Sequence, residues 1–493
     1  MDIAMDKLYA LSLPLDHAKK ALYVKGTSPY AVEKGSVLDF ITYFNSFCVK
    51  KWLRYTTLTK LELRLELRGR FRITFKTVGT NGEREVFSDV AEAPGYLRVF
   101  DHKTLSALDS LLGFELTCLE DGCEFSGGAW YGDFTDSRQL NIGISICTFK
   151  REEYVKRTLK TLEQFMPQAP WLRVLVVDNG GTLPLRDDGR VRILHNRNYG
   201  GSGGFARGMT EYAEQEDSPD YVLLMDDDIV LDTTAIERTH SFLCRLKPQY
   251  ADSFLAGAML SNEKPTVQFE NTAFWNGVTY RSNFHDWDLT DPVKLAQNGE
   301  LPAQKNQYAG WWYCCIPSER IRQIGYPLPL FIKNDDMEYS VRNDREIITL
   351  NGVGVWHQVF DTKQSPVMSY YANRNSLILQ HYTGGGRATL LLSLMLKAAK
   401  RLLRCDWAEL HVLARSAADY ILGLEKLTEL PADRFMQQIA ETVRCPFVAA
   451  DLLTLIKCAL CILFGFKGLD REYKTFRRIR LSDVSFWKAY FER

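Results

Sequence analysis

An alternation of strand-like and helix-like segments between residues 140 and 228 constrains the fold more than any other feature of this chain. Compact runs of apolar and β-branched residues predict strands, and the stretches between them have helical character. Strands that alternate with helices imply a parallel sheet covered on both faces, and such sheets bind ligands beyond the carboxyl ends of their strands. The predicted strands are 141–147, 172–177, 191–194 and 221–225, and the predicted helices are 151–165 and a stretch from about residue 205.

The chain on either side of this region has a different character. Residues 60–78 alternate apolar and polar side chains like one half-buried strand, and a turn follows at 79–82. Further short strands and turns predict a β-sandwich. From about residue 370 the pattern is helical, with blocks at 390–403 and 435–463. We therefore predict three domains: a β-sandwich over 1–137, an α/β catalytic domain over 138–370 and a helical domain over 371–493.

The composition is that of an ordinary globular protein, with 493 residues of which 46% are hydrophobic and 25% charged. Lys+Arg and Asp+Glu both number 61, and this balance argues against a dedicated nucleic-acid binder. The 11 cysteines are scattered without zinc spacing, and the first residues lack the basic region of a secretory signal, so we expect a reducing compartment. We expect no membrane span, because the longest apolar run, 452–466, is short and contains Lys457.

Three adjacent aspartates, Asp226, Asp227 and Asp228, follow the apolar strand YVLLM. Adjacent carboxylates repel one another unless a cation compensates, and Mg²⁺ or Mn²⁺ prefers oxygen ligands completed by substrate phosphates. Alternate residues of an extended segment point the same way, so Asp226 and Asp228 are predicted to share one ion while Asp227 faces elsewhere. A solvated acidic turn is the alternative. His357 follows an apolar strand and is either an ordinary core residue or the third ligand of this ion.

A glycine-rich segment, NYGGSGGFARG, runs from Asn198 to Gly208. It is no P-loop, because no Lys-Ser/Thr pair follows its glycines, but from Gly201 to Ala206 it satisfies the loose GxGxxA pattern. Close approach of the backbone to a ligand, with amides directed at negative charge, is the predicted function. A flexible loop that caps a helix is the alternative.

Two later motifs carry acids and aromatic rings. In FIKNDDMEY (331–339), Asp335 and Glu338 have capping-box spacing, which leaves Asp336 free to project from the first helical turn as a general base. In the GWWY segment, Trp311 and Trp312 either stack on sugar rings or pack in the core.

Taken together, these residues resemble the family-two inverting nucleotide-sugar glycosyltransferases of the GT-A (Rossmann-like) fold. The glycine segment, the WWY triplet and FIKNDDMEY resemble the bacterial galactofuranosyltransferases that build cell-surface galactan, which also carry an N-terminal β-sandwich and a C-terminal helical region. The segments YFNSF (43–47) and GGAWYGDF (127–134) are similar to that sandwich. Lys150 stands where the family often has Asn, and Cys314 and Cys315 follow the triplet, which puts the acceptor in doubt.

The resemblance implies a role for each site residue. Asp226, Asp228 and His357 would bind Mn²⁺ or Mg²⁺ on the donor diphosphate, and Asp336 would be the catalytic base. The acceptor groove would be shaped by Trp311 and Trp312 with Asp335 beside it. The implied donor-binding residues are Phe149, Arg151, Asp178, Asn198, Gly201, Asp227 and Glu270.

The implied reaction is a single inverting displacement that moves galactofuranose from UDP-galactofuranose to a cell-surface or lipid-linked glycan. Three alternatives stay open: a rhamnosyltransferase or another nucleotide-sugar glycosyltransferase, a dinucleotide-dependent oxidoreductase suggested by GxGxxA, and a non-catalytic glycan-binding protein. Three acids in a row suit a metal better than the single ribose-binding acid of an oxidoreductase. A homo-oligomer is left open.

The C-terminal region predicts a peripheral membrane contact. The apolar run 452–466 is followed by a segment at 471–480 in which basic residues interleave with aromatics, and then by Phe486, Trp487 and Tyr490. Basic side chains near an anionic leaflet and aromatic rings at the interface favour binding along the membrane. A helical domain packed on the catalytic core is the alternative. We therefore expect a cytoplasmic protein at the inner face of the cell membrane.

Overall fold

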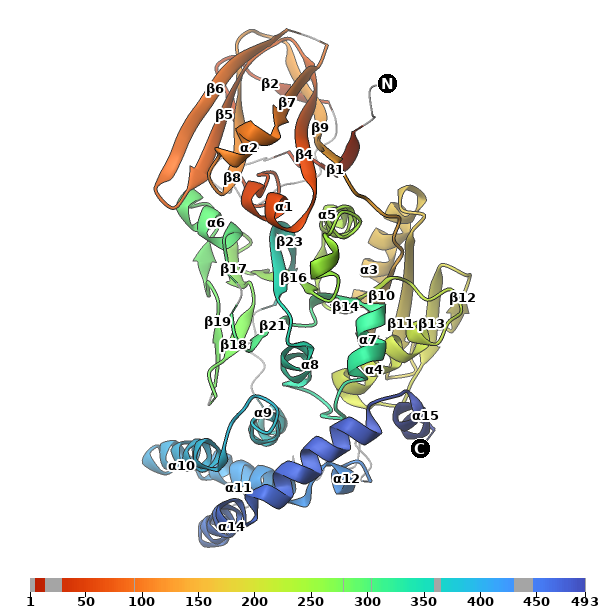
Figure 1. Cartoon of the computed structure of the whole chain (residues 1–493), viewed down its shortest axis with the longest axis vertical. Coiled ribbons are helices and arrows are strands. Elements are labelled where there is room, and N and C mark those ends of the chain that lie inside the picture. The colour runs from red at the N-terminus through yellow and green to blue at the C-terminus, as the bar shows by residue number, and fades with distance from the viewer. Residues whose placement is uncertain are drawn as a thin grey trace.

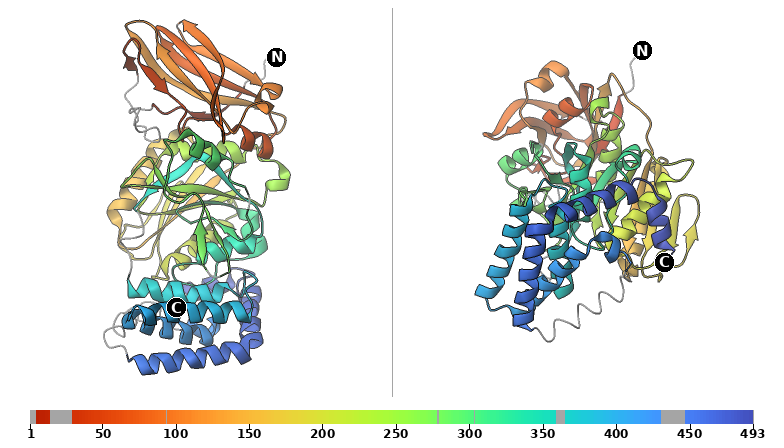
Figure 2. Two further views of the ribbon diagram at one scale, coloured as in Figure 1. Left: turned by 90° about the vertical axis from the view of Figure 1, so that its left-hand side faces the viewer. Right: turned by 60° about the horizontal axis from the view of Figure 1, so that its bottom comes forward.

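The computed structural model describes residues 5–13, 29–92, 94–277, 279–302, 304–358, 365–429 and 447–492. Three layers follow one another along the long axis: a β-sandwich at one end, a mixed α/β domain in the middle and a helical layer at the other end (Figure 1; Figure 2). The predicted fold class is therefore confirmed. The predicted boundary at 137/138 lies between the last strand of the sandwich and the first of the central sheet, whereas the one at 370/371 lies inside helix α9.

The sandwich consists of a five-stranded and a four-stranded antiparallel sheet. Residues 60–78, predicted as one strand, form two strands that belong to different sheets, and the chain crosses between them at Gly69, whose φ is +88°. A Cβ on Gly69 would lie 2.7 Å from Cys123 Sγ, so this crossing requires glycine. The predicted turn at 79–82 is confirmed. One sheet has β1 (Asp6–Ala10), β2 (Tyr30–Val32), β4 (Leu58–Arg68), β7 (Tyr96–Asp101) and β9 (Cys123–Phe134); the other has β3 (Val37–Asp39), β5 (Arg70–Gly79), β6 (Gly82–Glu92) and β8 (Leu111–Cys118).

The central domain is built on one 11-stranded sheet whose first strands are parallel. Strand order reverses at β10, because β11 and β13 continue to one side of it and β14 lies on the other. Such a reversal places a ligand site outside the carboxyl ends of the strands. All four predicted strands are confirmed, as β10 (Ile142–Thr148), β11 (Leu172–Asp178), β13 (Val191–His195) and β14 (Tyr221–Asp226).

Further strands extend the sheet beyond β14. β22 runs antiparallel to β14, and β23 runs parallel to β16 and brings His357 to the same edge as Asp226. The remaining strands of this sheet are β12 (Arg186–Asp187), β15 (Val230–Leu231), β16 (Phe254–Ser261), β17 (Val267–Glu270), β20 (Trp287–Asp288), β22 (Tyr313–Pro317) and β23 (Ile347–His357). A separate small sheet holds β18 (Ala273–Trp275), β19 (Tyr280–Ser282) and β21 (Gln307–Tyr308).

Helices cover the sheet and form the C-terminal layer. The helix predicted at 151–165 is confirmed as α3, whereas α4 begins at Gly200 rather than near residue 205, so the glycines are part of the helix. The helices of the first two layers are α1 (Val49–Tyr55), α2 (His102–Ser106), α3 (Glu152–Phe165), α4 (Gly200–Ala213), α5 (Thr233–Leu243), α6 (Pro292–Gly299), α7 (Ser318–Ile324) and α8 (Asp335–Asn343). The C-terminal helices are α9 (Pro366–Leu379), α10 (Arg387–Leu403), α11 (Trp407–Leu422), α12 (Leu424–Leu427), α14 (Val448–Arg480) and α15 (Ser485–Phe491).

The predicted helical block at 390–403 is confirmed within α10. Of the block at 435–463, residues 435–446 lie outside the described residues, and the rest belongs to α14.

The sandwich is tied to the central domain through buried polar contacts. Arg238 of α5 donates to the carbonyl oxygens of Phe44 and Asn351, and its guanidinium lies 3.5 Å from the centre of the Tyr9 ring. Tyr43 donates to the carbonyl oxygen of Val353 at 2.9 Å. These bonds join the YFNSF segment to the strand that ends at His357, so the sandwich supports one wall of the site.

Candidate active site

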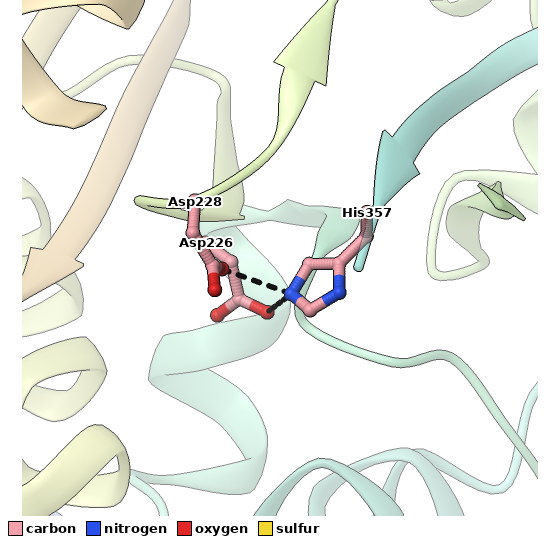
Figure 3. A group of neighbouring side chains, drawn as sticks. All are labelled: Asp226, Asp228 and His357. Atoms are coloured by element: carbon pink, nitrogen blue, oxygen red, sulfur yellow. Dashed lines mark ion pairs between the residues drawn. The ribbon is translucent and has the colours of Figure 1, made fainter. Parts of the chain in front are cut away.

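The three aspartates occupy the end of β14, at the reversal of strand order. His357 Nε2 lies 2.9 Å from Asp228 Oδ1 and 3.9 Å from Asp226 Oδ2, and ligand atoms of all three residues fall within 4.8 Å of one another (Figure 3). Asp227 is not part of this group of ligand atoms, and its carboxylate contacts Thr148 and Arg151, the second of which also contacts Asp228. The pattern of alternate side chains predicted from the sequence is therefore present in the fold.

Besides His357, the Arg151 guanidinium lies against this cluster. Arg151 Nη1 lies 3.0 Å from Asp227 Oδ1 and 2.7 Å from Asp228 Oδ2, and Thr148 donates to Asp227 Oδ2 at 2.7 Å. Burial raises the pKa of Asp226 against the opposing charge of His357, and the carboxylates of Asp228 and Asp227 raise it further. The cluster therefore carries more negative charge than a buried site tolerates easily, which favours a bound cation.

His357 is oriented in the manner of a metal ligand. Its Nδ1 lies 2.6 Å from the carbonyl oxygen of Gln358 and donates to it, which directs Nε2 at the aspartates. Burial acts to lower the pKa of His357, but the hydrogen bond with Asp228 and the charges of Asp226 and Asp228 outweigh it, so the pKa is raised. Two carboxylates and an imidazole with a bonded second nitrogen fit a divalent ion.

The glycine segment forms the first two turns of α4 and packs directly on the central sheet. A Cβ on Gly204 would lie 2.1 Å from Cys147 Sγ, and one on Gly208 would lie 1.9 Å from Ser145 Oγ. These two glycines therefore serve close packing of helix on strand. The flexible-loop alternative is wrong for this part of the segment, because there is no room for a longer side chain.

The start of α4 is joined to the segment that carries the candidate base. Ser202 N–H donates to the carbonyl oxygen of Phe331 at 3.0 Å, and Asn198 Oδ1 accepts from Gly200 N–H at 3.1 Å. Asn179, which the sequence analysis missed, donates to the carbonyl oxygen of Gly200 at 2.9 Å. Its position directly after Asp178 at a strand end was the available signal.

Asp178 holds the loop that follows β11. Its carboxylate accepts backbone N–H groups of Gly180, Thr182 and Leu183 at 2.9, 2.7 and 2.7 Å, and the residue is fully buried. In this structure the side chain shapes the loop that follows β11. Phe149, by contrast, is 41% exposed at the same sheet edge.

Asp335 and Asp336 begin α8, after a segment with left-handed backbone. Phe331, Lys333 and Asn334 have φ of 71°, 67° and 67°, and Asn334 is the residue before the helix. Asp335 is buried, whereas Asp336 is half-buried. Burial raises the pKa of both carboxyls, and the charge of Asp336 raises the pKa of Asp335 further. A carboxyl group whose pKa lies near neutral pH is suited to take up and release a proton.

The predicted capping box at this helix is wrong. Glu338 is fully buried and forms an ion pair with Arg342, and Arg477 of α14 lies 3.4 Å from its Oε1. The Glu338 carboxylate binds these two guanidinium groups instead of a backbone N–H at the start of the helix. Its side chain therefore links α8 to the C-terminal layer. Asp336 lies in the first turn of α8, as predicted, and its side chain is half-buried there.

Glu270 lies at the end of β17 and belongs to the same acidic region. Ser282 donates to its carboxylate, and burial raises its pKa to about 7, opposed by the Ser282 bond and increased by the charge of Asp336. Ser282 is a second residue that the sequence analysis missed.

Both indoles of the WWY triplet lie in the interior. Trp312 is 6% exposed and donates to the carbonyl oxygen of Gly257 at 2.9 Å, and Trp311 is 4% exposed with its ring against Phe205. This arrangement agrees with the core-packing alternative. Lys150, where the family often has Asn, has a φ of 55°, a backbone region that Asn adopts more easily.

Two family models match the chain. One, described as Galactofuranosyltransferase 2 N-terminal, matches residues 4–138, and the other, described as Glycosyl transferase family 2, matches residues 144–293. Residues 144–293 therefore match a family-two glycosyltransferase domain. The predicted GT-A fold and the predicted resemblance to galactofuranosyltransferases are thereby confirmed. The match to a glycosyltransferase domain also confirms the prediction that the protein is an enzyme.

Two curated proteins that are similar to this chain are named Galactofuranosyltransferase GlfT2. The protein from Mycolicibacterium smegmatis is 26% identical over 427 residues, covering 80% of this chain and 65% of the relative. The protein from Mycobacterium tuberculosis is 26% identical over 429 residues, covering 80% and 66%. The chain thus spans about two thirds of their length. Among solved structures, S. aureus TarS 1-349 is 14% identical, covers 66% of this chain and 92% of that chain, and has a TM-score of 0.36.

Proposed function

We propose that the protein is an inverting, metal-dependent glycosyltransferase that transfers galactofuranose from UDP-galactofuranose to a glycan acceptor. The observation that carries this proposal is the pairing of a galactofuranosyltransferase N-terminal region with a family-two domain whose aspartates and His357 converge. Relatives named galactofuranosyltransferase support the choice of sugar.

The donor end of the site is assigned to the edge formed by β10, β11 and β14. Asp226, Asp228 and His357 would hold Mn²⁺ or Mg²⁺, which when bound supplies positive charge opposite the leaving diphosphate. Arg151 pairs with both Asp227 and Asp228 and adds positive charge at this edge. The start of α4 directs its positive dipole end toward the same edge and favours an anionic donor.

Proton removal is assigned to Asp336. Its half-buried carboxylate accepts the proton of the acceptor hydroxyl while that oxygen forms a bond to the anomeric carbon. The bond between that carbon and the diphosphate oxygen breaks, and its electron pair leaves with the diphosphate. A single displacement of this kind inverts the anomeric centre. Asp335 and Glu270 line the same region and contact the sugars in this proposal.

The acceptor is proposed to be a cell-surface or lipid-linked glycan, and the site of action the inner face of the cell membrane. A lipid-linked acceptor requires the enzyme to reach a bilayer surface. Transfer of rhamnose or of another nucleotide-linked sugar is the second candidate, because a metal site and a base serve any such donor.

A donor screen tests the proposal. The full chain is incubated with Mn²⁺, a galactofuranosyl oligosaccharide and one of three donors: UDP-galactofuranose, UDP-galactopyranose or thymidine-linked rhamnose. We expect nucleotide release and a product one sugar longer with the first donor alone. Consumption of the rhamnose donor instead would replace the proposed sugar. Absence of transfer with every donor, in protein that still binds UDP, would support a glycan-binding protein.

A further inference from the structure

Two helices, α10 and the first half of α14, lie at the end of the molecule opposite the sandwich (Figure 1). They carry a concentration of exposed apolar side chains. Of 21 large apolar side chains exposed among the described residues, nine lie on these two helices. Exposed apolar clusters of this kind mark surfaces that bind something. We call them the α10–α14 face: Leu392, Met395, Leu396 and Leu403 of α10, with Leu453, Ile456, Leu460, Leu463 and Phe464 of α14.

The spacing shows that these side chains form stripes. The exposed residues of α10 recur at helical intervals opposite the buried Leu390 and Leu394. In the same way the exposed residues of α14 lie opposite the buried Leu455, Cys458 and Ile462. Arg387 donates to the carbonyl oxygen of Leu463 at 3.1 Å, which joins the start of α10 to α14. The two stripes therefore belong to neighbouring helices.

The exposed charged side chains within residues 387–404 and 448–468 are all basic. Arg387, Lys400, Arg404, Lys457 and Lys467 are exposed on or directly after these helical segments. Residues 387–404 and 448–468 contain one acid, Asp451, which is buried and lies 2.7 Å from Nδ1 of His411. An apolar face bordered by cations matches an anionic lipid surface.

Helix α14 is long and apolar enough to cross a membrane by length and composition, and 22% of its most apolar 18-residue stretch is buried. Its attachments nevertheless hold it within the helical layer. Leu455 and Ile462 lie in the core, and Tyr473 donates to the carbonyl oxygen of Tyr420 on α11. Leaving the layer to span a bilayer would expose these groups, so α14 is suited to lie on a membrane rather than to cross it.

The predicted interfacial aromatics do not contribute to this face. Trp487 and Tyr490 are buried, and Trp487 donates to the carbonyl oxygen of Pro327 at 3.0 Å. Of the basic residues that follow the apolar run, Arg477 pairs with Glu338 and Arg480 with Glu425. The sequence-based prediction that Trp487 and Tyr490 contact the membrane is therefore wrong, and α10, which the sequence analysis did not name, carries exposed apolar residues instead.

We infer that the α10–α14 face docks on the surface of an anionic lipid bilayer, with α10 and α14 lying in the interface. A second copy of the chain fits this face less well, because self-contact would bring these cations together, and neither 387–404 nor 448–468 has an exposed acid to balance them. The inference deepens the proposed location and rests on it for the choice of a membrane as partner. It does not depend on which sugar is transferred.

Co-sedimentation of the full chain with vesicles tests the inference. We expect binding to vesicles of phosphatidylglycerol and phosphatidylcholine, weak binding to phosphatidylcholine alone, and loss of binding at high salt. The variant Leu403→Ser/Phe464→Ser removes the two most exposed apolar groups, which are 86% and 83% exposed, so folding should survive. The variant Lys400→Glu/Arg404→Glu reverses charge at the border. We expect each to weaken partition into anionic vesicles by about tenfold or more.

Matched controls use the same changes elsewhere: Leu97→Ser/Leu185→Ser for apolar exposure and Lys34→Glu/Lys103→Glu for charge, all at exposed positions of the first two layers. Unchanged binding in both α10–α14 variants, or equal loss in the controls, would overturn the inference. Loss of a concentration-dependent dimer in Leu403→Ser/Phe464→Ser, without vesicle binding in the wild type, would assign the face to a second copy. Transfer to a water-soluble acceptor, measured in parallel, separates failure of docking from failure of the proposed activity.

Discussion

Two acidic clusters face the same site, and they differ in the charges around them. Burial is the first cause of a raised pKa in both clusters, at Asp226 and Asp227 as well as at Asp335, Asp336 and Glu270. The first cluster also forms ion pairs with Arg151 and His357, and these opposing charges favour the ionised carboxylates that a cation needs. In the second cluster the charge of Asp336 adds to burial and raises the pKa of Asp335 and Glu270 further, which favours their protonated forms.

The largest effect should follow from breaking the first cluster. We expect Asp228→Ala, or chelation of the wild type by EDTA, to reduce transfer to background, because one ligand or the ion itself is lost. Mn²⁺ or Mg²⁺ should restore the chelated wild type but not the variant, as measured by nucleotide release. Asp217→Ala, at an exposed carboxylate paired with Arg173, is the control. Full turnover in EDTA, with metal analysis showing an ion-free protein, would refute metal dependence.

Within the second cluster, Asp336→Asn should lower turnover by roughly 10²–10⁴-fold while donor binding stays near normal, the scale of losing a general base. Wild-type turnover should rise with pH across the weakly acidic range, because burial raises the pKa of Asp336 and the base must lose its proton. The variant should lack this rise. Asp335→Asn is the matched change, and loss of turnover there with normal turnover in Asp336→Asn would reverse the assignment.

The next test asks whether the two clusters depend on different supports. Trp487 of α15 is buried beside the glycine helix, where a Cβ on Gly203 would lie 3.5 Å from its ring. We expect Trp487→Ala to lower the free energy of unfolding by about 3–5 kcal/mol. Ser202 of α4 donates to the carbonyl oxygen of Phe331, in the segment that leads to Asp336. Because a disturbed α4 would shift that segment rather than the metal ligands, we expect transfer to fall while the affinity for Mn²⁺ is unchanged.

Denaturant unfolding and Mn²⁺ titration measure both quantities, with Trp407→Ala, at a 39% exposed tryptophan, as the control. An equal loss of Mn²⁺ affinity would show that one support serves both clusters.

The smallest effect concerns stability and pH. Burial raises the pKa of Glu270 from 4.5 to about 7, so the folded state holds a proton that the unfolded state loses. Its contribution to stability is full below about pH 4.5 and is lost as pH rises through about 7. Glu270→Gln should therefore be more stable than wild type at pH 8 by about 1–3 kcal/mol and similar at pH 4. Glu263→Gln, at an exposed glutamate that also accepts from a serine, should show no such difference in unfolding midpoint, and an equal gain there would contradict the burial argument.

The residues at the strand ends show which parts of the candidate active site the local sequence pattern can predict. Asp226, Asp228 and Asp336 were predicted from strand endings and helix starts, because side-chain direction there follows from backbone period. The glycine segment was predicted as a ligand loop, and its packing on Ser145 and Cys147 was not foreseen. Those contacts join residues far apart in the chain, and no local pattern reports which strand a helix will cover.

Residues 60–78 and 471–490 show the same limit in two other places. The first has the uniform alternation of one strand but divides between two sheets at Gly69. The second combines basic and aromatic residues, but its Trp487 is buried and its Arg477 pairs with Glu338.

What the sequence determined by itself is the order of strands and helices, the three layers and the acids at the strand ends, since hydrophobic period and residue chemistry are local properties. Only the tertiary structure decided that His357 meets Asp228, that Glu270 shares the region of Asp336, and which helices expose an apolar face. These outcomes depend on the distance and burial of residues separated by many positions in the chain, and both are set when the layers pack together.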